Sequence, residues 1–222
     1  MVKNYWTQII AIWIVVFLAA IFYGWNQYKA LSVGQENNLA GERSDELNES
    51  VQPTPSALLL SPISRPFERV LKKPLGIEVS PNDSPVSPEK FTGFHSGVDF
   101  ETFLDEQNVD VPISAICTGP LRIKQWAQGY GGVVVQDCFL NAQPITVIYG
   151  HLKLASVEQI AGDRITAGEF IGVLGDGFTS ETDDERKHLH LGIHRGNGPS
   201  ILGYVQSEEA LDGWIDIRDY LN

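Results

Sequence analysis

The chain has 222 residues, of which 43% are hydrophobic and 20% are charged, and its formal net charge is -12. These fractions are typical of a globular protein, and the length accommodates one ordinary domain and an appendage. An acidic surface of this kind would be repelled by phosphates, so the composition argues against a nucleic-acid-binding protein.

The N-terminal segment has the composition of a membrane span. Residues 9–23 carry no polar group except the Tyr23 hydroxyl, and aromatic residues flank the stretch. Residues 5–25 supply about the 20 residues that a helix needs to cross the hydrocarbon core. We expect residues 1–4 to be a short cytoplasmic end and residues 5–25 to be an uncleaved, single-pass transmembrane anchor. A cleaved signal peptide and a buried helix of a soluble domain are the alternatives, although the sequence after Tyr23 is a poor cleavage site.

The next segment, residues 26–60, is rich in Asn, Glu, Ser, Gln, Gly and Pro and lacks apolar periodicity until its last three leucines. Such a composition forms a poor core. We expect a disordered stalk, which would hold the following domain near a membrane surface.

Residues 61–222 contain short Val-, Ile- and Leu-rich stretches separated by Gly, Pro, Asn and Asp, which is an all-β pattern. The candidate strands are Val111 to Cys117, Leu121 to Trp126, Gly132 to Cys138, Ile145 to Tyr149, Ile171 to Leu174 and His188 to His194. Only short helical turns are expected, near Pro66 to Leu71 and Glu208 to Ile217. The fold class is therefore predicted to be mostly β, as one small antiparallel, sandwich-like domain after the transmembrane helix.

The two cysteines, Cys117 and Cys138, lie in two candidate strands with a plausible hairpin turn at Gln128 to Gly131 between them. Neither has the spacing of a zinc knuckle. A disulfide would fit a domain outside the cytoplasm, and two free buried thiols are the alternative.

All five histidines fall in three short segments, and four of them have a spacing that is meaningful for metal binding. In His95-Ser96-Gly97-Val98-Asp99, an extended backbone would place positions 95, 97 and 99 on one face, so that an imidazole and a carboxylate lean toward one ion across a glycine. Histidine and aspartate are ordinary zinc ligands.

The second segment, His188 to His194, alternates polar and apolar residues, so its histidines share one face while its aliphatic residues face the core. The third segment places His151 at the end of a strand. Each segment alone is more often solvated or structural than metal-binding, but the three together indicate a shared site, because catalytic zinc uses three protein ligands and keeps one position open.

The three segments resemble the signature of the lysostaphin-type (LytM-domain) zinc endopeptidases, which hydrolyse peptidoglycan. That signature is His-x-x-x-Asp, then a lone His within Tyr-Gly-His-Leu, then His-Leu-His, and all three parts occur here in that order. The resemblance extends over about residues 65–217. It departs from the family pattern at Leu191 and Gly192, neither of which occupies a ligand position.

The resemblance implies one Zn²⁺ per domain, with His95, Asp99 and His190 as metal ligands. It also implies that His151 and His188 are catalytic without binding the metal: His151 assists deprotonation of water, and His188 helps it or stabilises the oxyanion. The implied fold is small and mostly antiparallel, with loops around a groove for a flexible peptide.

Three other features carry open interpretations. The acidic stretch from Gly175 to Lys187 is either a solvated loop or a wall of the groove that favours an amine-bearing peptide. The glycine-rich sequence 129–132 is expected to be a hairpin turn rather than a phosphate cradle, because no helix follows it. We expect His194 to be a solvated residue at a strand end.

The expected function is that of a membrane-anchored zinc metalloendopeptidase that cleaves peptidoglycan cross-links or stem peptides. The expected location is the bacterial cytoplasmic membrane, with the catalytic domain outside the cytoplasm. Expected partners are peptidoglycan, the membrane through residues 5–25 and a cell-wall-machinery protein, but no nucleic acid. The alternatives are a regulatory domain that activates a separate wall amidase, and a secreted toxin against competing bacteria.

Overall fold

A computed structural model of the protein describes residues 59–69, 71–198 and 201–221. The expected cytoplasmic end (1–4), the anchor (5–25) and nearly all of the expected stalk lie outside these residues. In the part of the chain that is described, no helix is both long enough and apolar enough to span a bilayer.

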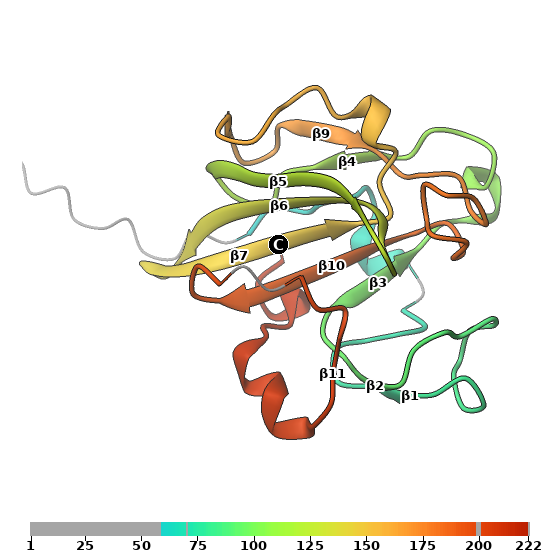
Figure 1. The fold of residues 1–222 in the computed structure, drawn as a ribbon. Helices are drawn as coiled ribbons and strands as arrows, with labels where there is room; N and C mark the ends of the chain where they lie inside the picture. Colours follow the sequence, from blue (N-terminus) through green and yellow to red (C-terminus); the bar gives the residue numbers. More distant parts are fainter. Residues whose placement is uncertain (1–58, 70, 199–200, 222) are drawn as a thin grey trace, which may run out of the picture. The chain divides into compact units, whose positions relative to one another are not determined.

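The domain consists of short antiparallel strands that form three sheets (Figure 1). The strands are β1 (Glu78–Val79), β2 (Gly93–His95), β3 (Val98–Glu101), β4 (Pro112–Ser114), β5 (Gly119–Ala127), β6 (Gly131–Leu140), β7 (Gln143–Gly150), β8 (Arg164–Ile165), β9 (Phe170–Val173), β10 (His188–Arg195) and β11 (Tyr204–Val205). Five 3-10 helices connect them: η1 (Pro66–Glu68), η2 (Leu104–Glu106), η3 (Leu154–Ser156), η4 (Glu208–Gly213) and η5 (Ile217–Asp219). The predicted mostly-β, antiparallel fold class is confirmed.

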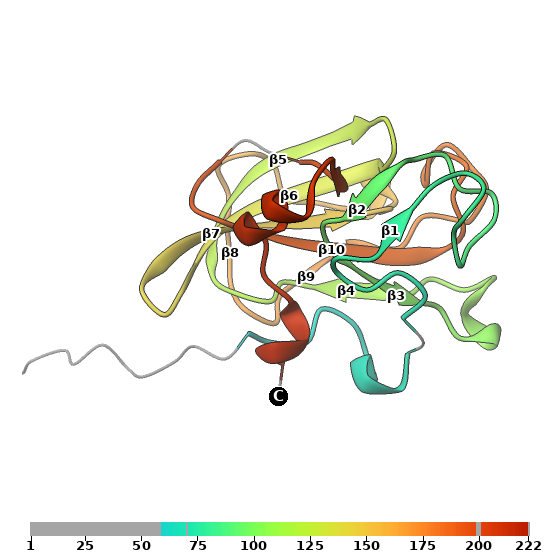
Figure 2. The same ribbon diagram turned by 90° about the horizontal axis from the view of Figure 1, so that it is seen from below.

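The largest sheet has six strands in the order β3-β10-β7-β6-β5-β8. A two-stranded sheet, β4-β9, and a three-stranded sheet, β1-β2-β11, accompany it. In Figure 1, β4 and β9 lie above the six-stranded sheet and the three-stranded sheet lies below it. Figure 2 shows β1 and β2 in front when the same ribbon is seen from below.

The six predicted apolar stretches correspond to β4, β5, β6, β7, β9 and β10, and the predicted turn at residues 128–130 joins β5 to β6. The sequence pattern did not predict β1, β2, β3, β8 or β11. Each of these strands has only two to four residues. That is too short for an alternating pattern to stand out from the surrounding loops.

The six-stranded sheet buries apolar residues on both faces. Alternate residues of β10, namely Leu189, Leu191 and Ile193, join the larger core together with β4 and β9. Val133 and Val135 of β6 point to the opposite face and join a smaller cluster with Trp214. Because side chains alternate along a strand, the histidines of β10 point toward this second face. The face that carries the histidines is therefore the one next to the three-stranded sheet.

The folded domain begins slightly earlier than predicted. Leu59 is only 1% exposed and forms a parallel bridge with Leu221, so residues 59 and 60 belong to the domain and not to the stalk. Further along, the buried Arg69 donates two hydrogen bonds to the Glu106 carboxylate, at 2.7 and 2.9 Å. These contacts attach the beginning of the domain to its body.

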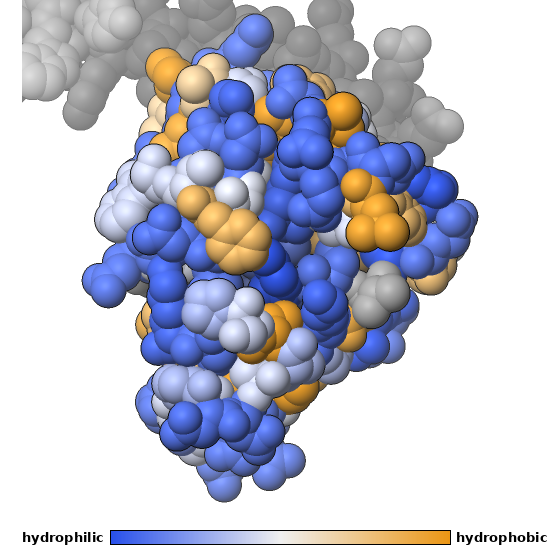
Figure 3. Space-filling model, turned by 90° about the vertical axis from the view of Figure 1, so that its right-hand side faces the viewer, coloured by the Kyte–Doolittle hydropathy of each residue, from blue (hydrophilic) through white to orange (hydrophobic). Residues whose placement is uncertain are grey.

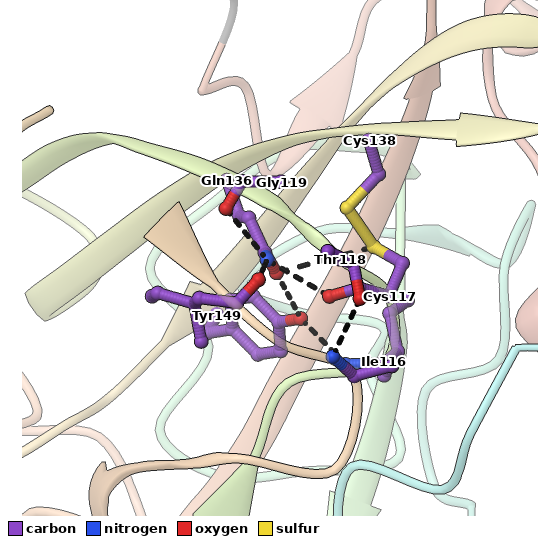
Figure 4. The surroundings of a disulfide bond; sticks show 9 residues. Ile116, Cys117, Thr118, Gly119, Gln136, Cys138 and Tyr149 are labelled. Atoms are coloured by element: carbon purple, nitrogen blue, oxygen red, sulfur yellow. Dashed lines mark hydrogen bonds between the residues drawn. A yellow bond between two sulfur atoms is a disulfide. The ribbon is translucent and has the colours of Figure 1, made fainter. Parts of the chain in front are cut away.

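The predicted disulfide between Cys117 and Cys138 is present, with a Cα–Cα distance of 6.1 Å. Cys138 lies in β6, as expected. Cys117 had also been expected in a strand, but it lies in the connection from β4 to β5. Beside the disulfide, the Tyr149 hydroxyl donates to Gln136 Oε1 at 3.0 Å, and Gln136 Nε2 donates to the Cys117 carbonyl at 2.9 Å (Figure 4). This buried amide and hydroxyl are thereby hydrogen-bonded.

The surface seen in Figure 3 is mainly hydrophilic, and its apolar residues lie in small separate groups. Among the large hydrophobic residues that remain exposed are Leu104 at 95% and Phe67 at 67%. Scattered exposed apolar residues are ordinary for a soluble domain. No large apolar patch is visible on this face.

Candidate metal centre

The two residues of the first histidine motif come from different sheets. The chain leaves the three-stranded sheet after His95 and enters the six-stranded sheet at Val98. At the break, Ser96 Oγ donates to the Leu202 carbonyl at 2.6 Å. The expected extended segment is therefore interrupted by a bend at Gly97. His95 and Asp99 nevertheless meet, with Nε2 and Oδ1 3.2 Å apart.

The register of the six-stranded sheet brings the other motifs to the same place. In β10, His190 pairs with Asp99 of β3 on one side and with Gly150 of β7 on the other. His151 follows Gly150 directly, at the end of β7. The strand pairing thus collects three sequence motifs at one end of the sheet.

Three side-chain atoms form a compact triangle. His95 Nε2 lies 3.0 Å from His190 Nδ1 and 3.2 Å from Asp99 Oδ1, and His190 Nδ1 lies 3.1 Å from Asp99 Oδ1. Donors at 2.0–2.1 Å from a tetrahedral zinc ion would be separated by about 3.3 Å. The three residues are 4% exposed or less. This cluster can hold a metal ion.

On the far side of the imidazoles, a carbonyl favours the His95 tautomer that a metal requires, and a hydroxyl can accept the corresponding proton of His190. His95 Nδ1 lies 3.3 Å from the Pro74 carbonyl, and His190 Nε2 lies 3.4 Å from the Tyr130 hydroxyl. Protons on these outer nitrogens leave His95 Nε2 and His190 Nδ1 free to bind a cation. Gly97 is required beside them, because a Cβ there would come within 2.7 Å of the His190 ring.

Asp99 is ionised despite its complete burial. Burial by itself would raise the pKa of Asp99, but nearby His95 and His188 and hydrogen bonds from His188 and His190 hold that pKa well below its usual range. Burial lowers the pKa of His190 to about 4. A charged carboxylate and a neutral imidazole are the forms that ligate zinc.

His151 and His188 lie beside the triangle, with ring centroids 4.2 Å apart. His151 has a left-handed backbone, with φ of 62°, which is uncommon for a non-glycine residue and is often found at functional sites. Burial, and then the neighbouring His188, lower the pKa of His151 well below its usual range. His151 Nδ1 is buried with no hydrogen-bond partner among the described residues. A neutral imidazole with a free nitrogen can accept a proton.

A cavity of about 270 Å³ opens beside these residues. Its lining combines residues of the histidine motifs and Glu185 of the acidic stretch with residues that no sequence pattern indicated, and the latter include Lys73, Tyr130 and Tyr204. These side chains come from loops and from a two-residue strand. No periodicity or metal-ligand spacing marks them, so only the fold shows that they lie at the site.

The model of peptidase family M23 matches residues 93–201, which contain all five predicted site residues. The domain belongs to peptidase family M23. No curated protein matched the chain.

Several solved structures are similar to this M23 domain. In the SpoIIQ-SpoIIIAH pore-forming complex, a chain aligns with a TM-score of 0.50 and 16% identity over 74% of this chain and 90% of its own length. The catalytic domain of lysostaphin from Staphylococcus simulans aligns with a TM-score of 0.47 and 20% identity over 69% of this chain and 92% of its own. LytU aligns with a TM-score of 0.47 and 19% identity over 68% of this chain and 83% of its own length. At these identities the likeness concerns the fold.

One expectation for the M23 domain is wrong. His194 is not a solvated strand end: its ring packs edge-on against Trp214, with centroids 5.0 Å apart, and its Nδ1 is buried. The reason is that η4 and the following residues return to cover the end of β10, where residues 194 and 214 form a bridge.

The acidic stretch from Gly175 to Lys187 is partly a solvated loop and partly a wall of the cavity. Asp184 is exposed to solvent, whereas Glu185 is 4% exposed and lines the cavity. The Asp183 carboxylate accepts a hydrogen bond from the Gly129 amide at 2.8 Å, which ties the stretch to the β5–β6 turn. This turn is the predicted hairpin and holds no helix N-terminus.

Proposed function

We propose that this M23 domain is a zinc metalloendopeptidase that hydrolyses peptide bonds in peptidoglycan cross-links or stem peptides. The observation that carries the proposal is the triangle of His95, Asp99 and His190 atoms, 3.0–3.2 Å apart, next to a cavity that the unpaired imidazole of His151 also lines. A ligand set, a proton acceptor and room for a peptide are thus combined.

The roles follow from the chemistry of each group. His95, Asp99 and His190 would hold the ion, and Zn²⁺ supplies Lewis-acid activation of water and of the scissile carbonyl when bound. His151, neutral at pH 7, accepts a proton from the attacking water. His188 lines the cavity beside His151, where it would assist His151 or stabilise the oxyanion that develops on the substrate.

The proposed location is outside the cytoplasm, with residues 5–25 as a membrane anchor and residues 26–58 as a tether. The Cys117–Cys138 disulfide supports this proposal, because disulfides persist in oxidising compartments. The apolar composition of residues 5–25 supports the anchor.

The test is digestion of peptidoglycans of several chemotypes by the purified full-length chain, with added zinc or with a chelator, and with the released fragments identified by mass spectrometry. The expected result is zinc-dependent release of peptides with new amino termini, which also identifies the bond. The matched control is the full-length His151→Asn variant, whose asparagine tolerates the left-handed backbone at this position.

If the wild-type chain binds one zinc ion and releases no fragments from any chemotype, the enzyme proposal is wrong. The domain would then be better explained as a regulatory module that binds a cell-wall amidase. Release of fragments that continues in the presence of chelator would contradict the zinc mechanism.

A further inference from the structure

Glu185 is a buried residue whose carboxylate accepts no hydrogen bond from the described residues. It is 4% exposed and lines the cavity next to His151 and His188. Its Oε1 atom is buried and has no partner among the described residues. The cation paired with Oε2 is Arg186, whose Nη1 atom lies 3.9 Å away. A buried carboxylate normally accepts two or more hydrogen bonds, so this group has unused acceptor capacity.

Arg186 engages other carboxylates through its Nε and Nη2 atoms, whereas its Nη1 atom, the one nearest Glu185, has no hydrogen-bond partner among the described residues. Arg186 donates to Glu101 at 2.6–3.0 Å and to Asp99 Oδ2 at 2.9 Å. The contact of 3.9 Å with Glu185 is longer than a hydrogen bond. The hydrogen bonds of Arg186 to carboxylates therefore go to Glu101 and Asp99, and Glu185 receives none from it.

Lys73, which lines the cavity, is also engaged by other groups. Its ammonium donates to the Tyr204 hydroxyl at 2.6 Å and to Glu89 at 3.3 Å, and it lies 3.6 Å from Asp99 Oδ2. Around this cavity, Lys73 and Arg186 thus face the carboxylates of Glu89, Asp99, Glu101 and Glu185. Of these four carboxylates, Glu185 is the one to which neither Lys73 nor Arg186 donates a hydrogen bond.

The backbone holds Glu185 firmly in position. Its carbonyl accepts hydrogen bonds from the Phe178 amide at 2.7 Å and from Thr182 Oγ1 at 2.8 Å. Burial, the largest effect, raises the pKa of Glu185. A positively charged ligand group would offset that burial and would find a carboxylate that needs no rearrangement.

We propose that Glu185 is a specificity-determining residue that binds a primary ammonium group of the peptide substrate in the cavity beside His151 and His188. The inference rests on the proposed function and deepens it: this domain prefers peptides that carry a free amine near the scissile bond. The amine is either the side-chain amine of a diamino acid or a free N-terminus, since both present the same ammonium chemistry.

The experiment uses the zinc-loaded full-length chain and a synthetic cross-linked stem-peptide dimer that contains diaminopimelate. The dimer is prepared with its amines free, with only the side-chain amine acetylated, or with only the N-terminal amine acetylated. Affinity is measured by calorimetry in the His151→Asn background, and kcat/KM is measured with His151 intact. Glu185→Gln removes the charge and keeps the shape, and Asp184→Asn is the control at the neighbouring exposed carboxylate.

We expect acetylation of one of the two amines to weaken binding about tenfold or more, because it removes a charge-assisted hydrogen bond. Glu185→Gln should abolish this discrimination while zinc content stays unchanged, and Asp184→Asn should preserve it. The acetylated amine that matters identifies the source of the ammonium.

The inference is overturned if Glu185→Gln weakens the binding of all three peptides equally. It is also overturned if that variant still discriminates against the acetylated peptide. Discriminating binding without any cleavage by the wild-type chain would contradict the proposed enzyme and leave the ammonium site intact. Cleavage of all three peptides at equal rates would contradict the ammonium site and leave the proposed enzyme intact.

Discussion

Arg186 Nη2 donates to Asp99 Oδ2 at 2.9 Å, while the other oxygen of the same carboxylate faces His95 and His190. The guanidinium also forms a fork with Glu101, so its plane is fixed from two sides. An arginine thereby determines which oxygen of Asp99 is presented to the metal position. Groups that orient metal ligands in this way contribute to affinity without touching the ion.

Replacing Arg186 with lysine should weaken zinc binding by about 10- to 100-fold, because a lysine ammonium cannot bridge Asp99 and Glu101 as a planar fork does. The measurement is competition for zinc against a chelating dye. Arg218→Lys is the matched control, since Arg218 pairs with Asp216 at an exposed site. Unchanged zinc affinity in the Arg186 variant would show that Arg186 is not the group that orients Asp99.

Substitutions of His95 and His151 should separate metal binding from turnover. His95→Ala removes one atom of the triangle and should abolish stoichiometric zinc binding. His151→Asn should retain zinc and lower kcat by about 100-fold or more, which is the usual contribution of a general base. Zinc content by mass spectrometry and peptide release are measured together, with His194→Asn as a control outside the cavity. A fully active His151→Asn variant would rule out the assigned base.

The stability of the zinc-free protein should fall as pH decreases from 6.5 to 5. The pKa values of His151 and His190 are lowered in the folded state, to about 4 for His190, so below pH 6.5 the unfolded chain binds protons that the folded chain does not. Each histidine then costs up to about 1.4 kcal/mol of unfolding free energy per pH unit. Urea unfolding in the presence of chelator measures the slope. A flat profile over this range would mean that both rings are protonated in the folded state.

The disulfide should stabilise the domain by restricting the unfolded chain. It joins residues 21 apart, for which the chain-entropy model gives about 3 kcal/mol. The Cys117→Ala/Cys138→Ala variant should lose this amount in urea unfolding at pH 7. Reductant should destabilise the wild type and leave the double variant unchanged. If reductant lowered the unfolding free energy of both proteins equally, its effect would not come from the Cys117–Cys138 disulfide.

The sequence by itself determined the strands that are long enough to alternate. In β10, the spacing of His188, Leu189 and His190 decides which side chains enter the core and which face the site, because neighbouring residues of a strand point to opposite faces. The Tyr-Gly-His-Leu motif likewise indicated His151 as a candidate catalytic residue. Such patterns are local, so they can be read without the fold.

Only the tertiary structure decided how these segments meet and what surrounds them. The break at Ser96 and Gly97, which transfers the chain between sheets, depends on a hydrogen bond to Leu202, more than 100 residues away. Arg186 and Glu185 are adjacent in an acidic stretch, yet one orients Asp99 and the other lines the cavity. The packing of distant loops sets these roles, because burial and pairing, rather than residue type, determine which charges are satisfied.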